Sequence, residues 1–121
     1  MNEQKQDFFR WLDGVCAAGL PETIQAVNFN LYEDEHDAWS VEMIGAPSFE
    51  EDDDWACEEV FSTRETPFVF CEQAGWEEIQ ARFADYILQY LQSGRQAQTL
   101  LRYQAVSLGF VDGDLHLLYK K

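Results

Sequence analysis

The sequence lacks the features that mark several large classes of protein. No apolar run approaches the roughly 20 residues that a membrane span requires. The first residues show no basic region followed by an apolar stretch, which a secretory signal would have. No GxGxxG or GxxxxGK[ST] pattern is present, so no nucleotide-binding loop is indicated. We therefore expect a cytoplasmic protein that uses no cofactor.

Cysteine and histidine are also scarce. The three cysteines, Cys16, Cys57 and Cys71, are odd in number and have no CxxC spacing, so neither a disulfide framework nor a zinc site is indicated. His36 and His116 belong to no motif that would pair them with a cysteine or serine nucleophile. We expect reduced, partly buried thiols and no catalytic residue.

Basic residues are few and unevenly placed. The chain has 8 Lys and Arg against 23 Asp and Glu, which gives a net charge of -15. The stretch from Trp11 to Thr63 contains no Lys or Arg but 14 Asp or Glu residues. This charge repels nucleic acid and anionic membranes and attracts a basic protein. A generic acidic surface is the alternative interpretation, because net charge does not specify function.

Apolar and aromatic residues are abundant, at 46% and 15%, so the 121 residues can bury the core of one domain, residues 1–121. Residues 3–18 place apolar side chains at helical spacing, and Gly19 and Pro21 favour a stop. Apolar residues alternate over residues 23–32 and again over residues 39–43. These two runs predict an antiparallel hairpin with an acidic tip.

The second half of the chain predicts further strands around a long helix. A short edge strand or turn at residues 60–61 and a strand at residues 67–71 precede a helix over residues 76–92, for which Gly94 favours a left-handed C-terminal cap. A further helical piece is expected over residues 96–101.

The end of the chain predicts a second hairpin. Residues 105–110 and 115–119 flank Asp112-Gly113, a dipeptide favoured in two-residue turns. Such a turn places three pairs opposite each other: Phe110 and Leu115, Leu108 and Leu117, and Val106 and Tyr119. The fold class is therefore α+β: an antiparallel or mixed sheet of about five strands packed against an N-terminal helix and a long central helix.

Two acidic clusters are the candidate functional sites. The hairpin tip contains Glu33, Asp34, Glu35 and Asp37, and the second cluster contains Glu50, Glu51, Asp52, Asp53 and Asp54 beside Trp55. The second cluster lacks the alternating ligands and central glycine of a calcium loop, so no metal site is expected. Charges beside aromatic anchors are typical of a surface that binds a cationic partner. Core packing is the alternative interpretation of Trp39, Phe49 and Trp55.

Residues 39–46 (WSVEMIGA) and 49–61 (FEEDDDWACEEVF) resemble stretches in small bacterial immunity proteins of polymorphic-toxin systems of the contact-dependent inhibition type. The resemblance implies a cytoplasmic, non-catalytic protein that binds a cognate toxin, often a nuclease, and blocks it. It carries over no binding residues.

Other functions stay open at this point. The chain could be an acidic adaptor or a self-associating interaction protein, since exposed aromatic residues would equally support a homodimer. A small hydrolase that uses paired carboxylates is the third reading, because the separation that identifies such pairs is a property of coordinates.

Overall fold

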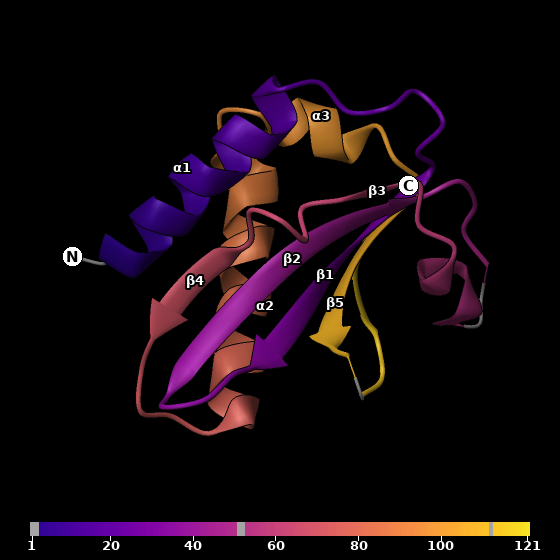
Figure 1. Cartoon of the computed structure of the whole chain (residues 1–121). Helices are drawn as coiled ribbons and strands as arrows, with labels where there is room; N and C mark the ends of the chain where they lie inside the picture. The colour runs from indigo at the N-terminus through magenta and orange to yellow at the C-terminus, as the bar shows by residue number, and fades with distance from the viewer. Residues whose placement is uncertain (1–2, 51–52, 112) are drawn as a thin grey trace.

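The computed structural model of the chain describes residues 3–50, 53–111 and 113–121 (Figure 1). Its elements follow in the order α1 (Glu3–Ala17), β1 (Ala26–Glu33), β2 (Ala38–Ala46), η1 (Asp53–Cys57), β3 (Phe61–Ser62), β4 (Phe68–Cys71), α2 (Trp76–Ser93), α3 (Ala97–Leu101), β5 (Ala105–Phe110) and β6 (His116–Lys120). The predicted α+β class and both predicted principal helices are confirmed. None of the helices in the described ranges has the length and apolar character to cross a membrane.

The six strands form one mixed sheet in the order β3-β2-β1-β5-β6, and β4 also pairs with β2. β1 and β5 are parallel, with Ala26 opposite Ala105, and the other pairs are antiparallel. The two central strands therefore come from distant parts of the chain, whereas the predicted β1–β2 hairpin joins neighbours. The short strands β3 and β4 together occupy one edge, and β6 occupies the other.

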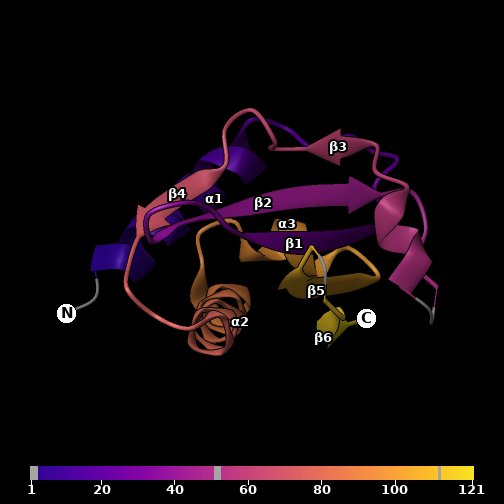
Figure 2. The same ribbon diagram turned by 60° about the horizontal axis from the view of Figure 1, so that its bottom comes forward.

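One face of the sheet carries the main core. The odd-numbered residues of β1, Val27, Phe29 and Leu31, are buried under the helices, as their alternation predicts. Phe8 of α1 packs edge-to-face on Phe29 at 6.3 Å and on Phe83 of α2 at 5.1 Å between ring centroids. Figure 2 shows α2 and α3 lying along this face. These contacts hold α1 and α2 in fixed positions against the sheet.

The opposite face carries small and polar residues. The even-numbered residues of β1 begin with Ala26 and continue through Asn28 and Asn30, so this face has little apolar surface for a helix to cover. At one end of the face, Trp55 of η1 packs against Ala26, Ala46 and Ala105 as a small second core. The rest of this face is held by a polar network.

The predicted register of the β5–β6 hairpin is only partly correct. Val106 lies opposite Tyr119 as predicted, but Leu108 lies opposite His116 rather than Leu117. The reason is a β-bulge between Val106 and Ser107, where Leu118 is an extra residue in β6. A bulge shifts the pairing by one position, and counting residues outward from the turn does not predict such a shift.

The connection between β5 and β6 is also longer than the predicted two-residue turn. β6 begins only at His116, so Leu115 does not pair with Phe110 and instead packs with the second core around Trp55. The loop folds back over β5, since a Cβ on Gly109 would lie 2.6 Å from the Asp114 carbonyl oxygen. Asp112, in the predicted turn, lies outside the described residues.

The predicted left-handed cap at Gly94 is wrong. Gly94 has a φ of -67° and a ψ of 154°, an extended conformation, and its N–H donates to the carbonyl oxygen of Tyr90. A Cβ at this position would lie 2.4 Å from Cδ1 of Tyr90. Glycine is required here because the backbone passes directly over the tyrosine ring.

Candidate functional site at the hairpin end of the sheet

The two predicted acidic clusters lie at opposite ends of the sheet. The β1–β2 tip follows Glu33 at the end of β1, whereas η1 lies beside Ala26 at its beginning, as Figures 1 and 2 both show. β1 contains 8 residues, and a strand rises about 3.3 Å per residue, so the two ends are roughly 25 Å apart. The clusters therefore form separate surfaces and not one acidic face.

The second predicted cluster spans the loop before η1 and the first residues of η1 itself. Glu50 and Asp54 are exposed, but Trp55 retains only 4% of its surface and packs edge-to-face on Phe49 at 5.4 Å. Core packing, the alternative interpretation of Trp55, is the one that its burial supports, so its ring is not a surface anchor. Three of the predicted positions lie outside the described part of the chain: Glu51, Asp52 and the side chain of Asp53.

The hairpin tip has a well-defined backbone. The Ala38 N–H donates to the carbonyl oxygen of Glu35 at 3.1 Å, and the Asp34 N–H donates to that of Ala38 at 2.8 Å. Between them, His36 and Asp37 have φ values of 57° and 60°. Two consecutive left-handed residues make a type I′ turn, which matches the twist of the flanking strands but is strained without glycine.

All four acids of the tip, Glu33, Asp34, Glu35 and Asp37, are exposed. The ion pairs among the described residues lie elsewhere, at Arg10, Arg64 and Arg82, and none of them involves a tip carboxylate. Within the described chain, no tip carboxylate therefore forms an ion pair, and Arg64, which lines a pocket together with Asp34, pairs with Glu42 and Glu59 instead.

An apolar pocket of about 450 Å³ opens beside this tip. It lies where the ends of β1 and β5 meet the start of α2, at the lower end of the sheet in Figure 1. Because β1 and β5 are parallel, their carboxyl ends open on the same edge, where ligands commonly bind in sheets with parallel strands. The lining residues are Leu31, Tyr32, Glu33, Trp76, Phe110, Val111 and Gly113.

The pocket has a half-buried aromatic wall, Phe110, which is backed by the buried ring of Trp39, and an exposed apolar rim. Phe110 packs edge-to-face against Trp39 at 6.1 Å and against Trp76 at 5.9 Å. Trp39 is buried, and its Nε1 donates to the carbonyl oxygen of Glu72 at 2.9 Å, which fixes the ring. Trp76 and Val111 instead keep 51% and 48% of their surfaces exposed. The pocket thus combines a fixed interior with uncovered apolar surface.

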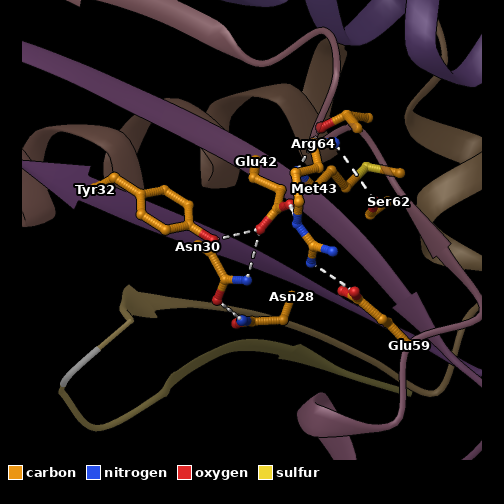
Figure 3. A network of polar contacts seen from close by, with 9 residues as sticks. Asn28, Asn30, Tyr32, Glu42, Met43, Glu59, Ser62 and Arg64 are labelled. Atoms are coloured by element: carbon orange, nitrogen blue, oxygen red, sulfur yellow. Dashed lines mark hydrogen bonds and ion pairs between the residues drawn. The ribbon is translucent and has the colours of Figure 1, made fainter. Parts of the chain in front are cut away.

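Glu42 is the centre of a polar network on the outer face of the sheet (Figure 3). Its side chain is 2% exposed and accepts hydrogen bonds from Asn30 Nδ2 at 3.1 Å, Tyr32 OH at 2.7 Å and Arg64 Nε at 2.9 Å. Arg64 also pairs with Glu59 at 2.5 Å. Burial, followed by the bond to Glu42, raises the pKa of Tyr32 to about 12, so its hydroxyl stays a donor.

The network continues across the central strands. Asn28 Nδ2 donates to Asn30 Oδ1 at 2.7 Å, and Ser107 Oγ donates to Asn28 Oδ1 at 2.8 Å. No buried side-chain polar atom among the described residues lacks a partner. Since Glu42 already accepts from three donors, it joins β1, β2 and the segment after β3 rather than facing solvent as a base. Among the described residues, no group of three or more His, Cys, Asp or Glu is arranged to hold a metal ion.

Sequence reasoning found the acidic tip but missed the pocket beside it. Leu31, Phe110 and Trp76 were assigned to separate elements, and only the parallel pairing of β1 with β5 brings them together. One signal was present: Phe110 and Val111 are consecutive apolar residues at a strand end, so alternation leaves one of them outside the core face.

Comparisons of this chain with protein-family models, with curated proteins and with solved structures give no match. The resemblance of residues 39–46 and 49–61 to immunity proteins therefore stays a prediction.

Proposed function

We propose that this protein is a non-catalytic binding protein of the cytoplasm that neutralises a basic toxin, with a nuclease as the toxin that its charge suits best. The observation that carries the proposal is the juxtaposition of four exposed carboxylates, none of them in an ion pair with a described residue, with an apolar pocket at one end of the sheet. Charges of this kind speed the encounter with a basic protein, and a pocket with exposed aromatic surface supplies the anchor. Enzymes that act on nucleic acid carry a basic surface that binds phosphate. An acidic inhibitor is attracted to the same basic surface and competes there with the nucleic acid.

A self-associating interaction protein is the second candidate. It is favoured by half-exposed apolar side chains on both sheet edges, Val69 on β4 and Leu117 on β6. Edge strands with apolar side chains are common sites of pairing between copies. In that case the acidic tip would keep other proteins away instead of attracting one.

The test is capture of partners by the whole chain from extracts of its own organism, at low and at high salt. Two variants with equal changes of charge serve as matched controls. The tip variant carries Glu33→Gln, Asp34→Asn, Glu35→Gln and Asp37→Asn, and the loop variant carries Glu50→Gln, Glu51→Gln, Asp52→Asn and Asp54→Asn. We expect a basic protein that is released by salt, is lost with the tip variant and is retained with the loop variant.

The captured protein is then expressed in a bacterial host with and without this chain. Growth arrest that this chain relieves is the expected result. A captured protein that does not impair growth would refute neutralisation of a toxin, and capture of this chain alone would favour self-association. Loss of binding only with the loop variant would show that the interface lies at the other end of the sheet, beside η1.

A further inference from the structure

We propose that the pocket between β1, β5 and α2 receives one apolar side chain of a basic partner segment, whose flanking lysine or arginine residues meet the acidic tip. This inference rests on the proposed function and names the surface and the chemistry of the partner. The occupant is a protein segment with an aliphatic or aromatic anchor between cationic residues.

The lining of the pocket suits an apolar side chain. Its volume of about 450 Å³ lies at the lower end of the range for ligand pockets. Phe110, Val111 and Trp76 provide its accessible apolar surface, Leu31 is almost fully buried in its wall, and Phe110 is held between two indole rings. A rigid, concave apolar site surrounded by polar residues is the usual form of an energetic centre in a protein interface.

The charge around the pocket selects the flanking residues of the occupant. Glu33 lines the pocket itself, and the remaining tip acids follow it along the chain. On the other side, Glu77 lies next to Trp76 in the first turn of α2 and is exposed. Glu33 therefore borders the pocket directly, and Glu77 lies beside the exposed ring of Trp76 in a neighbouring hollow, so a segment with acidic flanks would be repelled. The exposed face of Trp76 can also hold a cation.

The tip is fixed in place before any partner arrives. The Glu72 N–H donates to the Asp37 carbonyl oxygen at 2.8 Å, so the tip is bonded to the segment that leads into α2. Together with the turn bonds within residues 34–38, this contact sets the position of the acids relative to Trp76. A site that needs little ordering loses less entropy on binding.

A second copy of this chain is the competing occupant. Lys120 and Lys121 lie at the C-terminal end, which Figure 1 places at the opposite end of the sheet from the tip. A copy docked through these lysines would make a head-to-tail contact, and such contacts generate rings or filaments. Sedimentation velocity of the protein alone, over a range of concentrations, detects this occupant directly.

Two valines with the same exposure allow a matched test. Val111 on the pocket and Val60 near the other end of the sheet are both 48% exposed. Val111→Lys and Val60→Lys change the net charge equally, so a difference between them reports the pocket and not the overall field. Thermal unfolding checks that both variants fold. If Val111→Lys does not fold, Trp76→Gln replaces it as the pocket variant.

The probe is a capped peptide with one leucine between two pairs of lysines, compared with the same peptide carrying serine in place of leucine. We expect the leucine peptide to shift the NMR signals of the Trp76 indole N–H and the Val111 amide to saturation, and the serine peptide to affect the tip without saturating these two signals. Val111→Lys should lower the affinity of the protein for the leucine peptide about tenfold. Val60→Lys should leave the affinity for this peptide nearly unchanged.

Equal shifts from both peptides, or equal effects of both lysine variants, would refute the pocket as the docking site. Concentration-dependent association without peptide that Val111→Lys abolishes would replace the partner segment with a second copy. Neither result depends on the growth assay, so failure of the pocket and failure of toxin neutralisation are observed separately.

Discussion

Replacing Gly94 by alanine tests how α2 ends. The new Cβ would lie 2.4, 2.5 and 2.6 Å from three atoms of the Tyr90 ring, whereas carbon atoms pack best at roughly 3.5 to 4.0 Å. The ring cannot move aside easily, because its hydroxyl donates to Asp13 Oδ1 at 2.6 Å and accepts from the Gln96 N–H at 3.0 Å. We expect Gly94→Ala to lower the free energy of unfolding by roughly 2 kcal/mol, as overpacked sites do.

Gly14 supplies the control of opposite sign. It lies in α1, and apart from its chain neighbours and the backbone of its own helix nothing lies within 4 Å of the position that a Cβ would take. Gly14→Ala should therefore raise the free energy of unfolding by roughly 0.5 to 1 kcal/mol, because alanine favours the helix. The assay is urea unfolding followed by far-UV circular dichroism, with the slope of the transition unchanged in both variants.

A second substitution separates the clash from a backbone effect. In a Tyr90→Leu background the ring is absent, so Gly94→Ala should cost much less than in the wild-type protein. If the cost were the same in both backgrounds, the backbone conformation and not the ring would explain the glycine. If Gly94→Ala were as stable as the wild-type protein, the close approach would be refuted.

Three further outcomes are expected. The Arg82 guanidinium lowers the pKa of Glu72. The Glu72 carboxylate therefore stabilises the fold at pH values above its ordinary pKa, and this contribution is lost as the pH falls through the lowered pKa. Glu72→Gln should lower the free energy of unfolding by about 1 kcal/mol near neutral pH and leave it unchanged in strong acid, as urea unfolding at several pH values would show. His36→Gly should raise the free energy of unfolding by about 1 kcal/mol in a thermal melt, because glycine relieves the left-handed strain. Burial, followed by Asp13, raises the pKa of Cys16 to about 12, so iodoacetamide should modify the two exposed cysteines and spare Cys16 in the native protein, as mass spectrometry would detect.

Local patterns predicted the elements of the fold well because each element buries one periodic face. The alternation of Val27, Phe29 and Leu31 identified β1, and the helical spacing of residues 76–92 identified α2. The acidic tip followed from the same hairpin. These features depend on residues that are close in the sequence, and the structure keeps them nearly where they were predicted.

Features that depend on distant contacts were not predicted. The bulge beside Val106 changes the register of β6, and the packing of Trp55 on Ala26 removes a predicted surface anchor. The pocket arises only because β5 lies beside β1, and neither strand alone indicates its neighbour or direction. The sequence therefore predicted only part of the candidate site: it indicated the acidic tip but not the apolar pocket beside it.

The parallel pairing of β1 with β5 also bears on how the chain folds. Asn28 and Ser107, which are bonded across these strands, are 79 residues apart. During synthesis the β1–β2 hairpin can form early, but the centre of its sheet stays open until the last strands have emerged. Pairings over such long sequence separations form slowly, and an unpaired central strand is prone to aggregate. A chain shortened just before Ala105 would keep nearly all of its acidic residues, yet it would present the bare edge of β1 to every neighbouring molecule.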